Sequence, residues 1–511
     1  MTEQEAELVG NKRTSLWIYF CIVAVFILGT GLRLVDLTDP PLDYFVQRQL
    51  RGAIIARAIY YQLLPSADPK LRDQAIYLAN TMDPREPPVF EGLVAATYLV
   101  TGGERLWVAR IYSILFWLLG GIALYALARR MTSPLAAIAP LIYYFFLPWS
   151  VIFSRIFQPD LIMVMLTLWV AYTLYRWGET PSWKWAILTG LLAGLAAYIK
   201  LPAIFPIILM LIGVVLTSLG IKKAVTNLQV WTMAGLLIIL PAIYYLLIIP
   251  NSSSGWLSFT LGLLKNWISP SFYIRWIIFA GGLVDLGVAF ISFVGVWLLP
   301  KKARIIPLAL WLGYIIYGLA FSYHITTHEY YSIPLIPAVA LSLAPIAGLI
   351  FDYLSDRGHL ARWAVVGILI FSVFYSGWMA RSIMLGKNYR NEAISWQNMR
   401  QDLPQEGNLI GITHEQGYRI AYYGWQHVTP WPYTAVDEAT FDNNSDPMGD
   451  FGTRFESAVT GQDYFVVTLF SDFDSQPLLK SYLYDHYPIY SQGDGYLIFD
   501  LTQPLQSAPN G

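Results

Sequence analysis

The chain has 511 residues, of which 56% are hydrophobic and only 13% are charged, and its mean hydropathy is +0.48. Because a soluble globular protein carries about 25% charged residues, this composition excludes the soluble class and predicts an integral membrane protein with many helices. The net charge of −1 indicates neither a nucleic acid nor any other particular partner. The single cysteine, Cys21, excludes a disulfide within the chain.

The first predicted element is a membrane span at residues 16–35, preceded by a polar segment, 1–15, that ends near Lys12 and Arg13. The apolar run is about 20 residues long and lacks a small-residue cleavage site. The sequence therefore predicts a retained anchor and not a cleaved signal peptide.

The loop that follows, residues 36–106, contains two helical patterns and is therefore not a simple connector. Its segment YFVQRQLRGAIIARAIYYQL has apolar residues at helical spacing with arginines between them, which predicts an amphipathic helix in the membrane interface. The segment EPPVFEGLVAATYLVTGG, with Pro near its start and Gly at its end, predicts a second and shorter helix.

Apolar runs of bilayer length then recur, and with the first they predict about eleven spans. Basic residues gather in the linkers after the even-numbered spans, as Arg129 and Lys222 illustrate, so the N-terminus is expected in the cytoplasm. The ten further spans are expected at residues 107–128, 133–152, 160–177, 184–199, 202–219, 229–249, 273–299, 305–322, 332–350 and 362–380.

The last part of the chain, residues 381–511, has a different composition and no run of bilayer length. Short β-like runs, NLIGIT, DYFVVTLF and GYLIFDL, follow a helical pattern, NEAISWQNMRQDL. These signals predict a small α/β domain, which an odd number of spans places outside the membrane. The expected organisation is a cytoplasmic N-terminus (1–15), a helical membrane domain (16–380) and this outer domain.

Charged residues cluster on the predicted outer face, where they are costly unless they are paired or wet. A carboxylate there could take a proton from a weak nucleophile, and cations could hold a phosphate leaving group. They come from the first loop, the third-to-fourth linker, the end of the fifth span and the ninth-to-tenth linker: Asp39, Asp43, Arg48, Arg51, Arg85, Glu86, Arg155, Asp160, Lys200, His324, His328 and Glu329.

Each of these residues also has a simpler interpretation. Arg48, Arg51 and Lys200 could extend to lipid headgroups. Asp160 could cap a helix, and His328 with Glu329 could be an ordinary loop pair. Their shared side of the membrane favours a site, although it does not show that they are close in space.

The order and spacing of several motifs resemble a known family over about residues 15–350. They are DPPLDYFVQRQLRGAIIAR, EPPVFEGLVAATYLVTGG, SRIFQPDLIMVM, YIKLP and HEYYSIPLIP. Together they resemble the integral-membrane glycosyltransferases of the C type. More narrowly, they resemble the bacterial branch of glycosyltransferase family 39, which includes relatives of the protein mannosyltransferases and the lipid A aminoarabinose transferases.

This resemblance implies a polyprenyl-phosphate sugar donor, an acceptor on the outer side of a plasma (inner) membrane, and inversion at the anomeric carbon. It implies that Asp43 is the catalytic base, with Asp39 as the fallback, and that Asp160 is a second acidic residue of the site. Cations matching the donor-phosphate site are Arg48, Arg51, Arg85 and Lys200. The residues expected to line the cavity or meet the acceptor are Glu86, His328, Glu329 and Tyr330.

The sequence departs from the family pattern at several positions, so other modes of phosphate binding and other functions stay open. Many relatives have a lysine or histidine before the Pro-Pro pair, where this chain has Glu86, and some have a histidine where it has Phe45. Glu86 and His328 could hold a divalent metal. The alternatives to a transferase are a transporter or flippase for a lipid-linked sugar, or a membrane anchor for the outer domain. Neither the sugar nor the acceptor can be read from the sequence.

Overall fold

The computed structural model describes residues 3–82, 86–249, 263–441 and 447–505. Within them the chain forms two compact units, each built from separate stretches of sequence. Unit 1 comprises Met1–Thr38, Pro84–Phe90 and Trp107–Lys387, and unit 2 comprises Asp39–Asp83, Glu91–Leu106 and Asn388–Gly511. Most of the first loop therefore belongs to the same unit as the C-terminal part, a grouping that the predicted organisation did not contain.

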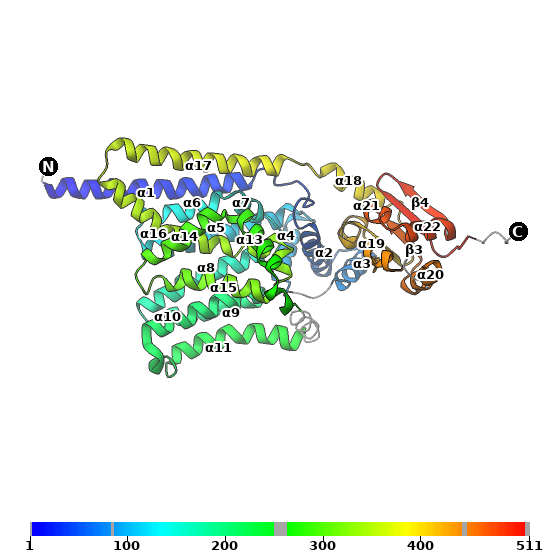
Figure 1. Ribbon diagram of the computed structural model, residues 1–511, viewed down its shortest axis with the longest axis horizontal. Coiled ribbons are helices and arrows are strands. Elements are labelled where there is room, and N and C mark those ends of the chain that lie inside the picture. The colour runs from blue at the N-terminus through cyan, green and yellow to red at the C-terminus, as the bar shows by residue number, and fades with distance from the viewer. Residues whose placement is uncertain (1–2, 83–85, 250–262, 442–446, 506–511) are drawn as a thin grey trace. The chain divides into compact units, whose positions relative to one another are not determined.

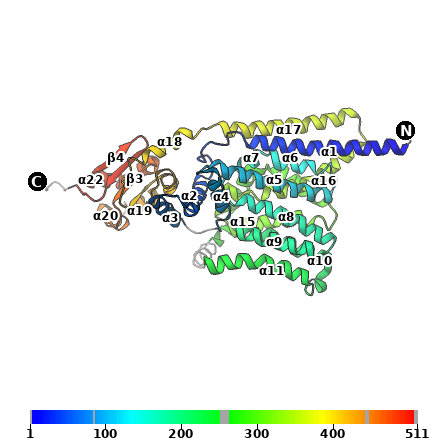
Figure 2. The same ribbon diagram turned by 180° about the vertical axis from the view of Figure 1, so that it is seen from behind.

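Unit 1 is a bundle of helices whose long members run alongside one another, with α1 and α17 side by side (Figures 1 and 2). Short 3-10 or π turns join several of them. The helices are α1 Glu3–Arg33, α5 Trp107–Met131, α6 Ile138–Phe146, α7 Pro148–Phe153, α8 Asp160–Glu179, α9 Trp183–Ile199, α10 Ile204–Ala224, α11 Leu228–Ala242, α13 Pro270–Val284, α14 Leu286–Gly295, α15 Ile305–Ala320, α16 Leu335–Ser355 and α17 His359–Leu385. The short turns are η1 Leu201–Ala203, η2 Ile243–Ile248, η3 Leu264–Ile268, η4 Val296–Leu298, η5 His324–Thr326 and η6 Glu329–Ser332.

All eleven ranges predicted to cross the membrane lie on these helices, and the chain is a multi-pass membrane protein. Seven described helices are long and apolar enough to span a bilayer, or eight if α13 and α14, bent by 85°, form one span. The count is below eleven because α9 and α15 have only 17 and 16 residues. In addition, the range 133–152 is broken before Pro148, since a residue that precedes proline avoids the helical conformation.

Arg33, at the end of α1, shows how charge can be buried inside this bundle. Its side chain is fully buried and donates hydrogen bonds to the carbonyl oxygens of Gly29 and Phe145, each at 2.9 Å, and to the Ser154 hydroxyl at 2.6 Å. A buried guanidinium is costly unless its donors are satisfied, so these bonds fix α1 against α6 and α7.

Glycines allow two pairs of helices to approach closely. A Cβ atom on Gly194 of α9 would lie 2.2 Å from the Leu236 carbonyl oxygen of α11, and one on Gly313 of α15 would lie 2.5 Å from Pro206 of α10. Small residues at such positions are typical of helix packing in membranes.

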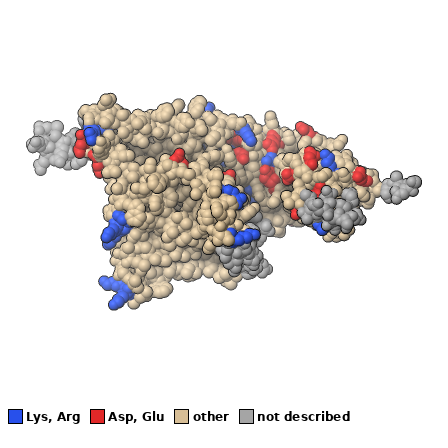
Figure 3. All heavy atoms as spheres, in the orientation of Figure 1, with Lys and Arg blue, Asp and Glu red and all other residues tan. Residues whose placement is uncertain are grey.

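The surface of unit 1 matches its assignment to the membrane. On the face that Figure 3 shows, few charged side chains lie over the long helices, and basic groups gather at the end where α10 turns into α11. Lys222 and Lys223 lie in the last turn of α10. This distribution fits helices whose sides face lipid and whose basic ends meet water.

Unit 2 is an α/β unit around a five-stranded sheet of order β2-β1-β3-β5-β4. The first three strands in this order are parallel, and the last two are joined as an antiparallel hairpin. The strands are β1 Leu409–Ile412, β2 Val428–Pro430, β3 Tyr464–Val467, β4 Ile489–Gly493 and β5 Tyr496–Asp500. The helices and short turns are α2 Val46–Leu63, α3 Pro69–Asn80, α4 Val89–Thr101 (which begins in unit 1), α18 Arg390–Met399, η7 His414–Gly417, η8 Ile420–Gly424, α19 Ala435–Phe441, α20 Pro447–Ala458, α21 Phe470–Asp474 and α22 Pro477–His486.

Both faces of this sheet are buried. Alternate residues of each strand point to opposite sides, so Ile410 and Phe465 pack into one cluster with Phe455, whereas Val466 and Ile498 pack into another. The predicted small α/β domain is present, as are the predicted helix at α18 and strands at β1, β3 and β5. The predicted interfacial helices correspond to α2 and α4, but α3, β2 and β4 were not predicted.

Candidate active site

A buried ion pair lies between the start of α8 and the end of α9. Lys200 Nζ donates a hydrogen bond of 2.6 Å to Asp160 Oδ2, and the two residues are 3% and 0% exposed. Asp160 is the first residue of α8, while Pro159 occupies the N-cap position, so Asp160 is not the cap of its helix. Helix α9 ends at Ile199, and Lys200, which follows it, has an extended backbone. Pro202 has no backbone N–H and could not have continued the hydrogen bonds of this helix.

Aromatic rings complete the surroundings of this pair. Lys200 Nζ lies 5.4 Å from the ring centroid of Tyr330 and 5.6 Å from that of Tyr331. Tyr331 is in turn stacked between Tyr317, at 5.8 Å, and His324, at 5.1 Å. Ring faces attract a cation, so this cluster helps to hold the ammonium in place. The structure thus brings together three predicted site residues: Asp160, Lys200 and Tyr330.

The other predicted residues of unit 1 lie as follows. The ring of His328 meets that of Tyr330 edge-on at 5.5 Å, and its Nδ1 lies 2.8 Å from the Thr327 hydroxyl. Glu329 is exposed, and Glu86 is half-buried and interacts electrostatically with Tyr245. Arg85 lies outside the described residues.

A metal centre finds little support in the donor set. Among the residues that the structure describes, no group of three or more His, Cys, Asp or Glu side chains could hold a metal ion. Glu86 and His328 would supply two ligands, whereas a protein zinc site needs three or four.

In unit 2 the two candidate bases differ sharply. Asp39 is 7% exposed; its Oδ1 accepts a hydrogen bond from the Tyr389 backbone N–H at 3.1 Å and pairs with Arg390 at 3.2 Å. Asp43 is exposed, and the one hydrogen bond described for it is a long contact of 3.5 Å from Gln49 Nε2. Asp39 is thus committed to holding its own unit together, while Asp43 is presented to solvent.

Local backbone geometry keeps Asp43 in this position. Phe45, which precedes α2, has a φ of 51°, in the left-handed region that bulky residues rarely adopt. Two phenols lie close to Asp43: burial first, and then the charge of Asp43, raise the pKa values of Tyr44 and Tyr389. A strained turn with a carboxylate at its surface is a feature that functional sites often share.

The arginines of α2 have different environments. Arg48 is half-buried and Arg51 is 6% exposed. Arg57 pairs with Glu104 at 2.9 Å, donates to the Tyr422 carbonyl oxygen at 2.7 Å, and lies over the rings of Tyr422 and Trp425, each at 4.1 Å. Arg57 is therefore a structural residue of unit 2.

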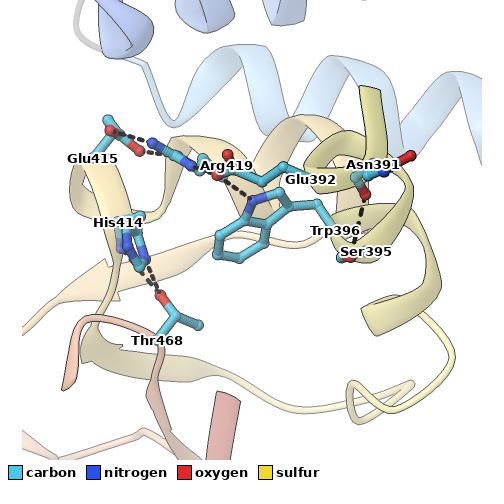
Figure 4. A network of polar contacts seen from close by, with 8 residues as sticks. All are labelled: Asn391, Glu392, Ser395, Trp396, His414, Glu415, Arg419 and Thr468. Atoms are coloured by element: carbon cyan, nitrogen blue, oxygen red, sulfur yellow. Dashed lines mark hydrogen bonds and ion pairs between the residues drawn. The ribbon is translucent and has the colours of Figure 1, made fainter. Parts of the chain in front are cut away.

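A second polar network in unit 2, shown in Figure 4, surrounds Arg419. Arg419 pairs with Glu415 and Glu392, and Glu392 also accepts a hydrogen bond from Trp396 Nε1 at 3.4 Å. His414 lies 3.1 Å from the Thr468 hydroxyl. Glu415 and Gln416 have positive φ values of 46° and 54°, so this network holds a strained turn.

Several residues of these sites escaped prediction from the sequence. Tyr331 lies within the motif HEYYSIPLIP, but its ring was not predicted as part of the site. Tyr317 and the network of Arg419 carry no motif, and they contact residues from other segments of the chain, such as Tyr331 and Glu392. A weak signal existed for α3, since Asp68 followed by Pro69 is a typical helix start, and the Asp68 side chain does cap this helix.

Comparison with known proteins agrees with this picture. Residues 85–248 match the family model for dolichyl-phosphate-mannose-protein mannosyltransferase, and no curated protein matches the chain. The apo crystal structure of ArnT from Cupriavidus metallidurans superposes with a TM-score of 0.58 at 15% identity, over 95% of this chain and 98% of ArnT.

Two further solved structures have the same fold. ArnT bound to undecaprenyl phosphate gives a TM-score of 0.53 at 17% identity, over 94% of this chain and 97% of that one. The archaeal oligosaccharyltransferase AglB from Archaeoglobus fulgidus, in complex with an inhibitory peptide and a dolichol-phosphate, gives 0.57 at 13% identity, over 97% and 75%.

The resemblance indicated by the sequence motifs is confirmed by a family match in the sequence and by a shared fold over nearly the whole chain. The expectation of a glycosyltransferase agrees with the family match and with the fold of these structures. The chain thus has the fold of the C-type membrane glycosyltransferases, and its residues 85–248 are similar to the dolichyl-phosphate-mannose-protein mannosyltransferases.

Proposed function

We propose that this protein transfers a sugar from a polyprenyl-phosphate donor to an acceptor on the outer side of a plasma membrane, with inversion at the anomeric carbon. The observation that best supports the proposal is the buried pair of Lys200 and Asp160 beneath Tyr330 and Tyr331, in a chain of this fold. Two of the solved structures with this fold contain a bound lipid phosphate, undecaprenyl phosphate in one and dolichol-phosphate in the other.

Lys200 is the residue proposed to stabilise the negative charge of the departing phosphate. Its ammonium has three N–H donors, and the hydrogen bond to Asp160 uses one. A cation shielded from water interacts more strongly with an anion than an exposed one does. Asp160 would act as the positioning residue that fixes the ammonium, and Arg48, Arg51 and Arg85 would supply further positive charge to the lipid phosphate.

Asp43 is the proposed general base. It would take the proton of the acceptor hydroxyl while that oxygen forms a bond to the anomeric carbon, and the bond from that carbon to the phosphate oxygen breaks with its electron pair on the phosphate. The exposure of Asp43 supports this role, whereas Asp39 is buried and engaged with Arg390. Glu86, His328, Glu329 and Tyr330 are proposed to line the acceptor side.

The N-terminus is proposed to be cytoplasmic, and unit 2 to lie outside. The basic residues at the turn from α10 to α11 support this orientation, since positive charge favours the cytoplasmic side.

The test is transfer of radiolabelled sugar from a panel of polyprenyl-phosphate donors by the purified full chain, with membrane extract as the source of acceptors. Asp43→Asn is expected to fold normally and lose transfer, and Asp73→Asn, at an exposed residue of α3 outside the proposed site, serves as the matched control that retains it. Transfer at the normal rate by Asp43→Asn would remove Asp43 from the mechanism. Movement of a lipid-linked sugar across liposomes, with no labelled product, would establish the flippase alternative.

A further inference from the structure

Unit 2 contains a polar pocket of about 570 Å³ at the amino-terminal ends of its three parallel strands. Asn408 precedes β1, His427 precedes β2, and Gln462 lies just before β3. Helix α3 contributes Gln74 and Tyr77, which are three residues apart and so share one face. Ligand pockets in proteins have volumes of roughly 300–1,000 Å³, so this one has the size of a binding site.

The wall of the pocket is rich in carboxamides, which can both donate and accept hydrogen bonds. Among them, Gln426 Oε1 and Gln462 Oε1 are shielded from solvent and accept no hydrogen bond from the protein. Leaving such acceptors without a partner is costly, and a ligand hydroxyl group that donated to either oxygen would remove that cost. The amides on the wall are Gln74, Gln405, Asn408, Gln426 and Gln462.

Three aromatic side chains complete the pocket. Tyr77 is 48% exposed and meets the ring of His427 edge-on at 6.5 Å. Burial lowers the pKa of His427, which disfavours the charged form of its ring. Trp425 is held by Arg57 on its ring, at 4.1 Å, and by a hydrogen bond of 2.8 Å from Gln74 to its carbonyl oxygen.

Trp425 adopts this position under strain. Its φ is 59°, in the left-handed region that non-glycine residues rarely enter, and such strain tends to persist at ligand-binding segments. Arg57, which lies over the Trp425 ring and pairs with Glu104, helps to hold this strained backbone in place.

The charge of the pocket narrows the class of ligand. Its lining includes one cation, Arg400, and one anion, Glu406, both of them exposed, and the other side chains are neutral. A phosphate or another strong anion would meet no excess of positive charge here, and a lipid tail would meet no continuous apolar wall. Hydroxyl groups could form hydrogen bonds with the amides, and the C–H face of a sugar ring could pack on an exposed aromatic ring.

We infer that this pocket binds a neutral saccharide, with Tyr77 as the ring platform and Gln426 and Gln462 as partners of its hydroxyl groups. The inference does not depend on the proposed transferase activity, because all the lining residues belong to unit 2. It adds a second sugar-recognising site to the candidate active site.

The experiment uses the full chain in lipid nanodiscs, since maltoside and glucoside detergents carry the chemistry of the expected ligand. Saturation-transfer NMR is recorded, without any donor, for mannotriose, maltotriose, cellotriose and chitotriose, with trigalacturonate as the anionic comparison. At least one neutral trisaccharide is expected to bind with a dissociation constant of about 1 mM or lower.

Variants then locate the binding. Tyr77→Ala and Gln462→Leu are each expected to weaken binding about tenfold, whereas Tyr77→Phe should change it by less than about twofold, because the ring remains. Tyr490→Ala is the matched control, since Tyr490 is 47% exposed on β4 and does not line the pocket. Thermal unfolding of each variant confirms that it is folded.

Each other outcome overturns the inference. No binding of the neutral trisaccharides up to about 10 mM would do so, as would binding of trigalacturonate alone. Binding that survives both Tyr77→Ala and Gln462→Leu would place the saccharide elsewhere. Asp43→Asn separates the two proposals, since it should lose transfer and keep trisaccharide binding.

Discussion

Lys200 Nζ lies 2.6 Å from Asp160 Oδ2, although the two residues are 40 positions apart and both are shielded from solvent. Breaking a buried ion pair by removing one partner leaves an uncompensated charge, which costs about 3–5 kcal/mol. The stability of the helix ends around this pair therefore depends on both residues, beyond any part they take in catalysis.

The first prediction follows from this dependence. Lys200→Met alone is expected to lower the unfolding temperature clearly, because it leaves Asp160 buried without its partner. The double variant Asp160→Asn with Lys200→Met should recover much of that stability and still lack transfer. Thermal unfolding followed by intrinsic fluorescence, with the transfer assay run in parallel, checks both statements. A single variant as stable as the native chain would show that the pair is not needed for stability.

A second prediction concerns the ring of Tyr331, which lies 5.6 Å from Lys200 Nζ. Tyr331→Phe keeps a ring face beside the Lys200 ammonium. Tyr331→Leu removes the ring, and with it a cation–π interaction of about 0.5–2 kcal/mol that helps to position the ammonium. We expect Tyr331→Leu to lower kcat with little change in KM for the acceptor, and Tyr331→Phe to retain most of the rate. Equal losses in the two variants would implicate the hydroxyl group and not the ring.

A third prediction tests the close approach of α9 and α11. Gly194→Ala would place a Cβ atom 2.2 Å from the Leu236 carbonyl oxygen, so the helices must separate, at a cost of about 1–3 kcal/mol. Gly235→Ala is the matched control, because a Cβ atom on Gly235 of α11 meets nothing within 4 Å. The unfolding temperature should fall for Gly194→Ala and stay level or rise for Gly235→Ala. A level value for both would mean that the two helices separate without cost.

A fourth prediction concerns pH and the network of His414. Burial, and next the positive charge of Arg419, lower the pKa of His414 from its ordinary value of 6.5, against the opposing charges of Glu415 and Glu392. Between the folded and the unfolded pKa values of His414, the unfolded chain binds more protons than the folded chain does. The contribution of His414 to the stability of unit 2 is therefore fully present above pH 6.5 and is lost as the pH falls below it.

The measurement is the unfolding temperature of the full chain from pH 7.5 to pH 5. His414→Gln should flatten part of this profile, while His427, whose pKa is also lowered by burial, accounts for a further part. A profile that His414→Gln leaves unchanged would contradict a contribution from this side chain.

Much of the fold could be predicted because single segments carry the signals. Apolar length marks the membrane helices, and short runs of aliphatic and aromatic residues mark β1, β3 and β5, whose residues are buried on both faces. The strands β2 and β4 carry weaker signals: β2 has three residues and ends in Pro430, and β4 is mostly exposed. The span at α6 and α7 was predicted as one helix, since the apolar run continues across Pro148.

The candidate sites were harder to predict because their contacts join distant segments. The choice between Asp39 and Asp43 depends on Arg390 and Tyr389, about 350 positions away, which no local pattern reveals. The pairing of Asp160 with Lys200 likewise follows from the packing of α8 against α9. Residue types indicated the chemistry, whereas the tertiary fold decides which side chains are already committed to one another.

Unit 2 is assembled from three stretches of chain, Asp39–Asp83, Glu91–Leu106 and Asn388–Gly511. A ribosome makes the first two long before the third, so α2 and α3 must wait while every helix from α5 to α17 is synthesised and inserted. Domains generally fold as units, and this one lacks its sheet until the last strand, β5, has emerged. A premature stop before residue 388 would leave the first loop without its folding partner, and a fragment starting there would lack α2 and α3. Neither fragment would contain the whole of unit 2.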